Sequence, residues 1–432
     1  MSERKIVLIG AGSASFTVGL VADLLTSGIE AAWTIGLVDI DGDALGIAKA
    51  LVERMVHKRG LEVAVEASTD RADILPHADV VVTTISVGGR KAWETDILVP
   101  LKHGICQPVG DTVGAGGISR ALRQIPPMLD IAEDVHRLCP NAYFFNYANP
   151  MGAICRAVNK ATPARVVGLC HGVQGTLRYL CSLIDVPYHE TSALYLGMNH
   201  LTWITHLTRH GEDLWPRIDA RLPQLAADDN PFSWELYRAY GAFPAVLDRH
   251  VVEFFSERFA GGDYYGRRLG VEVMNILDVI QSGNEGFERM ARLARGEEEL
   301  PEGLFDRVLG EHEALIPIVA SLLADKHEVF PMNVPNRTVD GIPRDFVLEM
   351  PVMATRAGCL PIGLPPMPTA VLAWTTEALY GVELTVEAAV AGDRNLVAQA
   401  LLYDRCVPDL EAAEALADDL LAAHREHLPR FA

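Results

Sequence analysis

The sequence predicts an α/β protein that begins with a doubly wound parallel sheet of the Rossmann type and continues into a C-terminal α+β domain. An apolar run at 5–9 leads into a glycine turn at 10–15 and then into a helical pattern. Further apolar runs alternate with helical stretches, as expected of parallel strands joined by crossover helices. These runs lie at 33–38, 78–86, 142–146 and 165–169.

A change of pattern predicts a boundary between two parts of the chain. Strand-like stretches at 191–195 and 202–208 are followed by long helical ones. We therefore expect an NAD-binding Rossmann domain over 1–188 and an α+β domain over 189–432 that carries substrate, metal and subunit contacts. The stretch 410–428 has the Leu/Ala spacing of an amphipathic surface helix.

Composition narrows the class of partner. The chain has 432 residues, 49% of them hydrophobic, which is enough for an extensive core. Its 57 acidic against 37 basic residues give a net charge of −20, so we expect a small-molecule partner and no nucleic acid. The seven cysteines include no CxxC pair, which favours a reducing, cytoplasmic setting. No apolar run reaches the about 18 residues of a membrane span, and no signal peptide is recognisable.

The glycine turn predicts a dinucleotide site. Gly10 permits the tight turn, Gly12 lets the backbone approach a pyrophosphate, and the next helix offers unpaired N–H groups to the anion. The usual third glycine is Ser15 here, which loosens the match. The alternative is a purely structural turn. The predicted site also includes Ser13 and Phe16.

Asp39 follows the second predicted strand and indicates NAD rather than NADP. Its carboxylate can accept hydrogen bonds from both ribose hydroxyls and repels a 2′-phosphate. Its distance from the glycines exceeds the usual spacing of about 20 residues. A solvated turn aspartate is the alternative interpretation.

Polar residues follow several of the predicted strands. Ligand sites of open α/β sheets lie beyond the carboxyl ends of the strands, so these residues face one crevice. Cys170 with His171, and Asn199 with His200, are candidate ligands of a single metal. A buried cysteine and a hydrogen-bonded polar histidine are the alternatives.

Several long stretches resemble the family 4 glycoside hydrolases, in the same order and over nearly the whole chain. They include IGAGSASF, LVDID, ISVGGRKAWETDILVPLKHGICQPVGDTVGAGGISRALRQIP, CPNAYFFNYANPM, GLCHGVQGT, GMNHLTW and VELTVEAAVAGDRNLVAQALLYD. The resemblance implies a fold like that of lactate and malate dehydrogenases. It also implies a glycosidase that depends on NAD and on a divalent metal, usually manganese, and forms homodimers or homotetramers.

The resemblance further implies redox-assisted elimination, an exception to the two-carboxylate mechanism. NAD takes hydride from sugar C3, a base removes the acidified C2 proton, the glycosidic oxygen leaves, water adds and the hydride returns, with no net oxidation. The metal acts as a Lewis acid on the C2 and C3 oxygens. By motif, Cys170 and His200 are its protein ligands.

Further roles follow from the same resemblance. His171 assists the leaving aglycone, Asn149 binds sugar hydroxyls, and Asn199 binds substrate or supports the metal. Turn or cap formation is the alternative for both asparagines. Asp111 lies in the glycine-rich stretch 109–117, which could close on the substrate, with a loop cap as its alternative.

The expected C2 base lies in the stretch 240–250. Asp248 is our first choice, because the stretch resembles the aspartate-containing form of the branches that act on unphosphorylated α-glycosides. Tyr240 is the second candidate. A structural ion pair between Asp248 and Arg249 is the alternative. Elsewhere, Arg90 follows two glycines and could contact a cofactor phosphate or an acidic substituent.

The residues after Cys170 indicate the substrate branch. Cys-His resembles the branches for unphosphorylated α-glycosides, and Cys-His-Gly most resembles the uronic-acid branch. An α-glucuronidase or α-galacturonidase is therefore expected, with an α-glucosidase or α-galactosidase as the alternative. A 2-hydroxy-acid dehydrogenase of the same fold and a non-catalytic NAD sensor are alternatives from other classes.

Overall fold

The computed structural model describes residues 2–14, 16–306 and 314–431. Its N-terminal half contains six parallel strands in the order β3-β2-β1-β4-β5-β6, which is the strand order of a doubly wound dinucleotide-binding sheet. The strands are β1 (Ser2–Ile9), β2 (Ala31–Val38), β3 (Ala64–Ser68), β4 (Val80–Thr83), β5 (Tyr143–Asn146) and β6 (Val166–Gly168).

Helices cover this sheet and bury its central strands. Val80 to Val82 of β4 have no exposed surface, which explains why the strand reads as a continuous apolar run. The helices are α1 (Thr17–Thr26), α2 (Gly42–Arg59), α3 (Arg71–Ile74), α4 (Gly89–Lys102), α5 (Gly114–Leu138), α6 (Met151–Ala161) and α7 (Gly172–Leu183).

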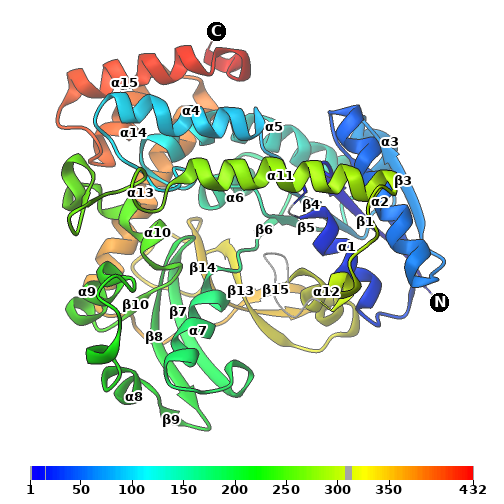
Figure 1. Ribbon diagram of the computed structural model, residues 1–432, viewed down its shortest axis with the longest axis horizontal. Coiled ribbons are helices and arrows are strands. Elements are labelled where there is room, and N and C mark those ends of the chain that lie inside the picture. Colours follow the sequence, from blue (N-terminus) through cyan, green and yellow to red (C-terminus); the bar gives the residue numbers. More distant parts are fainter. Residues whose placement is uncertain (1, 15, 307–313, 432) are drawn as a thin grey trace.

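The C-terminal half extends the same sheet (Figure 1) and adds a small separate sheet of two strands, β11 (Asp263–Tyr264) and β12 (Arg267–Arg268). Strand β13 (Glu328–Pro335) pairs antiparallel with β6 and with β14 (Val347–Thr355), which in turn pairs with β7 (Thr191–Met198). Strand β8 (Leu201–Arg209) follows β7 as a hairpin. Short strands complete the edge: β9 (Glu212–Asp213), β10 (Phe243–Pro244) and β15 (Gly358–Pro361). The predicted Rossmann sheet with a second α+β part is confirmed.

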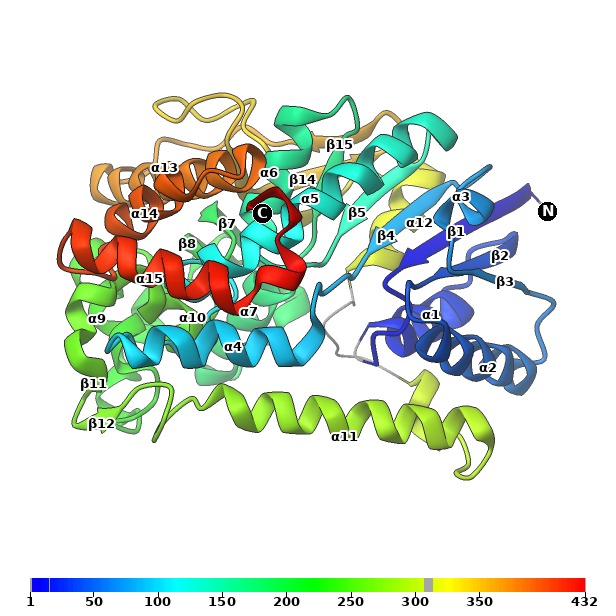
Figure 2. The ribbon, with the colours of Figure 1, turned by 90° about the horizontal axis from the view of Figure 1, so that it is seen from above.

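Helices of the C-terminal half also pack against helices of the N-terminal half. Helix α11 (Ile276–Arg295) runs alongside α4 and reaches α2, as Figure 2 shows. At its far end Lys58 of α2 donates to the carbonyl oxygen of Leu300 over 2.7 Å. Helix α12 (Leu315–Ala324) packs against α1. The remaining helices are α8 (Trp215–Asp219), α9 (Pro231–Tyr240), α10 (Leu247–Val251), α13 (Thr369–Ala391), α14 (Arg394–Tyr403) and α15 (Leu410–Ala423).

The C-terminal helix is shorter and more firmly anchored than the sequence predicts. Helix α15 ends at Ala423, and His424 is only 2% exposed. The His424 Nε2 lies 3.0 Å from Oδ1 of Asp96, which also binds Arg123. This buried contact ends the predicted surface helix early. Among the described residues, no helix combines the length and apolar character needed to cross a membrane.

Candidate active site

The glycine turn after β1 has the geometry that the sequence predicts. Gly10 has φ +92°, and its N–H donates to the carbonyl oxygen of Val38 over 2.8 Å. A Cβ atom at Gly12 would lie 2.8 Å from the Ala44 side chain and 2.9 Å from Asp39 Oδ2. Only glycine therefore fits at either position.

Asp39 closes the turn from the end of β2. Its Oδ2 accepts the N–H of Gly12 over 2.8 Å, and its Oδ1 accepts the N–H of Asp41 over 3.0 Å. Among the described residues no side chain caps α1 at Phe16. The Thr17 N–H donates to the carbonyl oxygen of Ser13, and the next first-turn N–H groups are available to an anion. Ser15 lies outside the described residues.

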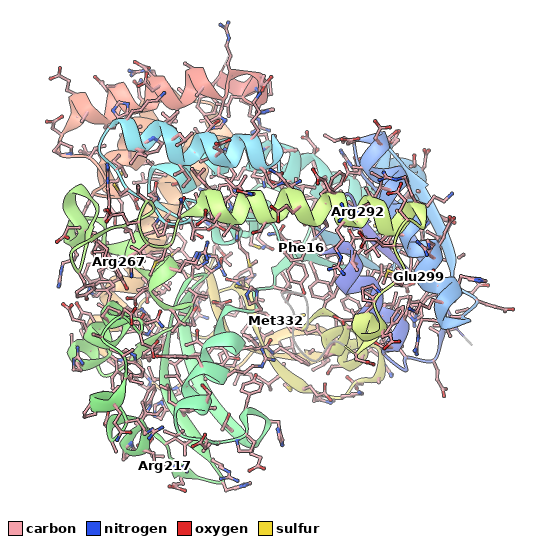
Figure 3. All side chains as sticks on the ribbon, viewed as in Figure 1. Phe16, Arg217, Arg267, Arg292, Glu299 and Met332 are labelled. Atoms are coloured by element: carbon pink, nitrogen blue, oxygen red, sulfur yellow. The ribbon has the colours of Figure 1, made fainter. Side chains whose placement is uncertain are left out.

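Phe16 joins the glycine turn to the polar loop after β5. Its ring lies 5.2 Å from that of Tyr147, and its N–H donates to Ser13 Oγ over 3.4 Å. Figure 3 shows Phe16 near the middle of the molecule, between its two halves. The predicted cofactor residues thus surround one turn that faces the second half of the chain.

A second cluster brings together Asp111, His200 and His250. Their potential ligand atoms all lie within 4.8 Å of one another, and the two imidazole rings are 4.0 Å apart. Asp111 precedes α5, His200 lies in the β7–β8 turn, and His250 belongs to α10. Among the described residues, this is the one group of three or more His, Cys, Asp or Glu side chains with such spacing.

The charges of this cluster are set by burial and by each other. Burial opposes ionisation of Asp111, but His250, His200 and Arg120 outweigh it, so the pKa of Asp111 lies below its ordinary value. Burial lowers the pKa of both His200 and His250. One carboxylate thus faces two neutral imidazoles, which is the protonation state that a metal requires.

Thr112 determines which nitrogen of His200 is free. Its hydroxyl donates to Asp111 Oδ1 over 2.6 Å and lies 2.6 Å from His200 Nδ1. Because the hydroxyl proton is used toward Asp111, Nδ1 of His200 must donate to the hydroxyl oxygen. Nε2 of His200 is left with its lone pair, ready to bind a cation.

Asn149 and Arg120 surround the other side of Asp111. The Asn149 amide donates to Asp111 Oδ2 over 2.9 Å, and its own Oδ1 is buried without a partner among the described residues. Arg120 donates to the carbonyl oxygen of Asn149 over 3.1 Å and lies over the Trp93 ring. Nη1 of Arg120 is also buried and unpartnered. These orphaned atoms mark a place for a polar ligand.

Cys170 lies beside the cluster but outside the group of three. Its sulfur accepts the N–H of Gly172 over 3.3 Å, and burial together with Glu349 raises the pKa of the thiol. Asn199 lies between Cys170 and Glu349 and lowers the pKa of both groups. The two predicted metal ligands, Cys170 and His200, therefore face one region of the structure.

The structure gives Asp248 a different role from the predicted base. Its carboxylate has no exposed surface and accepts four hydrogen bonds of 2.6–2.9 Å. The donors are the N–H of Phe232, the N–H and hydroxyl of Ser233, and the hydroxyl of Tyr264. Asp248 thus satisfies the first turn of α9 and is not available to a substrate. This corrects the prediction.

The remaining predicted residues have distinct surroundings. The Tyr240 hydroxyl accepts the indole N–H of Trp374 over 3.0 Å. Arg90 donates to Asn284 of α11 over 2.5 Å, so this contact engages it in helix packing. His171 is exposed at the start of α7 and helps to lower the pKa of both cluster histidines.

His250 is the main residue that sequence reasoning missed. It lies two positions after Asp248, and residues two apart on a helix point to nearly opposite sides. The choice of Asp248 therefore excluded its neighbour from the same site. A search for a second imidazole to complement His200 would have found it. Three other residues near Asp111 carry no comparable sequence signal: Thr112, Arg120 and Glu253, whose carboxylate accepts the N–H groups of Val109 and Gly110.

Comparison with known proteins decides the family. The model of the family 4 glycosyl hydrolases matches residues 5–186, and the model of their C-terminal domain matches residues 195–407. The chain belongs to the family 4 glycosyl hydrolases. The predicted resemblance and enzyme class are confirmed.

Individual relatives cover the whole length of this family 4 chain. An α-galacturonidase of Thermoanaerobacterium saccharolyticum is 31% identical, with 99% of this chain and 97% of that protein aligned. The structure of a putative glucosidase from Bacillus subtilis has a TM-score of 0.85 at 28% identity, covering 98% of this chain and 100% of the other. A 6-phospho-α-glucosidase from gut microorganisms, in complex with NAD and Mn²⁺, has a TM-score of 0.86 at 19% identity, covering 99% of both chains.

A malate dehydrogenase from Plasmodium falciparum shares the fold. Its TM-score is 0.51 at 15% identity, over 90% of this chain and 98% of that one. The predicted similarity to malate dehydrogenases is therefore confirmed at the level of architecture. Fold alone does not imply a shared reaction.

Proposed function

We propose that this family 4 enzyme is a glycosidase that uses NAD and Mn²⁺ to cleave unphosphorylated α-glycosides, with α-uronides as the preferred substrates. The observation that carries the proposal is the Asp111–His200–His250 cluster, to which both halves of the chain contribute residues. The carboxylate of Asp111 is a ligand of the type that suits Mn²⁺. The similarity of this chain to an α-galacturonidase supports α-uronides as the substrate class.

The metal site is assigned to Asp111, His200 and Cys170. Nε2 of His200 carries a free lone pair, and Asp111 is ionised although buried. Cys170 needs a bound cation to become a thiolate, because burial keeps it protonated. When bound, the metal supplies Lewis-acid stabilisation of negative charge on the sugar oxygens.

The base is assigned to His250 in place of Asp248. The side chain of His250 is 19% exposed against 6% for His200, so His250 is the imidazole that can reach a substrate. Its buried Nδ1 has no hydrogen-bond partner and lies 3.8 Å from Asp111 Oδ1. A small approach of Asp111 places the proton on Nδ1 and leaves Nε2 free to accept the C2 proton.

Arg249 supports the choice of an acidic sugar. It is partly buried, lies close enough to His250 to lower the pKa of that imidazole, and forms no hydrogen bond or ion pair within the described part of the chain. A guanidinium fork fits a carboxylate in a bidentate way. A uronate carboxylate would pair this cation.

The cofactor test separates the proposal from its alternatives. NAD supplies the hydride acceptor at C3 and is regenerated, so we expect turnover to need NAD only in catalytic amount. Protein stripped of nucleotide should release no sugar until NAD is added. Full activity without NAD would contradict the redox mechanism, and steady accumulation of NADH would indicate a 2-hydroxy-acid dehydrogenase instead.

Metal ligation is tested by Cys170→Ser and His200→Ala. Each variant should lose Mn²⁺ binding by at least about tenfold, because each removes a direct ligand. NAD affinity should stay within about twofold, since the glycine turn lies on other elements. Calorimetric titration of the metal-free proteins measures both constants. Unchanged metal affinity in both variants would refute the ligand assignment.

The substrate class is tested by Arg249→Ala. A charge-assisted hydrogen bond contributes about 1.5–3 kcal/mol, so kcat/KM for an aryl α-uronide should fall roughly 10–100-fold. The same constant for a neutral aryl α-galactoside should change little. Higher wild-type activity on neutral α-glucosides or α-galactosides than on uronides would instead favour the alternative substrate class.

A further inference from the structure

A row of polar residues crosses the sheet directly behind the candidate active site. Pairing in the sheet sets Gly168 of β6 opposite Asn333 of β13, and Asn333 opposite Glu349 of β14. Glu349 is paired with Gly197 of β7, which is paired with Thr202 of β8. The row therefore joins the strand that leads to Cys170 with the hairpin that carries His200.

The polar side chains of this row are completely buried and bonded to each other. Glu349 is 1% exposed, and Asn333 and Thr202 have no exposed surface. Asn333 Nδ2 donates to Glu349 Oε1 over 3.2 Å, and the oxygens of Thr202 and Glu349 Oε2 are 2.5 Å apart. Burial of a carboxyl group costs free energy of folding. If stability were the only requirement at position 349, an apolar residue would serve better.

The number of available protons determines the direction of the hydrogen bonds between Glu349, Thr202 and Met198. The Thr202 hydroxyl lies 2.5 Å from Glu349 Oε2 and 3.0 Å from the carbonyl oxygen of Met198, but it has one proton to give. Both contacts are satisfied if the Glu349 carboxyl is protonated and donates to Thr202, which donates to Met198. Burial raises the pKa of Glu349 to about 7, in agreement with a neutral group.

The row includes two glycines, Gly168 and Gly197, that admit no side chain. A Cβ atom at Gly197 would lie 2.1 Å from the carbonyl oxygen of Leu201, and one at Gly168 would lie 2.9 Å from the Asn333 side chain. Cys170 and Asn199 each follow one of these glycines by two residues. The side chain of Asn199 lies beside both Glu349 and Cys170, so the row reaches the active-site residues.

The turn that this row supports is strained and lacks internal partners. His200 has φ +68°, a conformation that favours glycine or asparagine. The amide oxygen and nitrogen of Asn199 are buried and make no hydrogen bond of good geometry within the described residues. Asn199 instead lies between Cys170 and Glu349. The surroundings, and not the turn itself, must hold these two residues in place.

We propose that Glu349 is a positioning residue, which acts as a neutral hydrogen-bonding group to hold Asn199 and His200 opposite Cys170. This inference rests on the metal site of the proposed glycosidase, but its test needs no turnover. Glu349 touches neither metal nor substrate and acts through the β7–β8 turn. Groups of this kind commonly alter metal affinity 10–100-fold.

The test compares Glu349→Gln with Glu349→Met in the full chain. Glutamine accepts from Asn333 and donates to Thr202, so E349Q should bind Mn²⁺ within about threefold of wild type. Methionine fills the space without hydrogen bonds, so E349M should bind Mn²⁺ about 10–100-fold more weakly. NAD affinity, measured in the same titrations, should be unchanged in both variants.

Thr202→Val supplies a second test if E349M does not fold. Valine removes the hydroxyl that links Glu349 to Met198, and Mn²⁺ affinity should fall in the same direction. Thr162→Val is the matched control, because Thr162 is a buried threonine whose hydroxyl donates to the carbonyl oxygen of Val158 and accepts the N–H of Ala164, both at the end of α6. It should lower thermal stability without altering Mn²⁺ affinity.

Two results would overturn the inference. Wild-type Mn²⁺ affinity in folded E349M, or in T202V where E349M is unfolded, would show that the row does not position the ligands. A loss in E349Q equal to that in E349M would show that the charge of Glu349 matters and not its hydrogen bonds. If the protein binds Mn²⁺ but cleaves no glycoside, the proposed function fails while this comparison still stands.

Discussion

His250→Ala is expected to lower kcat by roughly 10²–10⁴-fold, the usual contribution of a general base. His250 is the more exposed imidazole of the cluster, and its Nδ1 faces Asp111 at 3.8 Å. Removing the ring should stop C2 deprotonation while leaving hydride transfer at C3 possible. A small burst of bound NADH without sustained product release is therefore the expected signature.

Isotope exchange locates the affected step. Wild-type product formed in D₂O should carry deuterium at C2, because a base open to water exchanges its proton before returning it. His250→Ala should lose both turnover and C2 exchange, while Mn²⁺ affinity falls less than in His200→Ala. If Mn²⁺ affinity is lost equally in both variants, His250 is a ligand and not the base.

The pH profile provides an independent check on the base. Burial lowers the pKa of His250, so the imidazole stays neutral and able to accept a proton below the ordinary histidine range near 6.5. The acid limb of the kcat profile should therefore lie below pH 6.5. An acid limb clearly above that value would contradict a neutral buried imidazole as the base.

Asp248→Asn is expected to destabilise the fold by about 3–5 kcal/mol, because one buried carboxylate serves four donors. An asparagine presents an NH₂ group to at least one backbone N–H of the α9 first turn. The melting temperature should drop by roughly 3–6 °C, as measured by calorimetry. Turnover per folded molecule should fall far less than in His250→Ala.

A partial deletion of the same contacts gives the control. Ser233→Ala removes one of the four hydrogen bonds and should cost only about 1 kcal/mol. One result would instead support Asp248 as the C2 base. If Asp248→Asn keeps the wild-type melting temperature but abolishes C2 exchange, Asp248 is the base.

Local sequence rules determined the N-terminal sheet, the glycine turn and the strand ends that carry Cys170 and His200. Buried parallel strands produce continuous apolar runs, and the turn requires glycine at positions 10 and 12 whatever surrounds it. These features depend on residues close in sequence. The family resemblance rests on the same stretches.

Tertiary structure alone decided how the chain completes the site. Whether Asp248 or His250 faces Asp111 and His200 depends on the phase of α10 and on the position of the α9 N–H groups that Asp248 satisfies. The row behind the site depends on β13 and β14 joining the edge of β6 after more than 150 further residues of chain. Local periodicity predicts neither the orientation of His250 nor the polar row. Both depend on which hydrogen-bond donors and which strands meet once the core is packed.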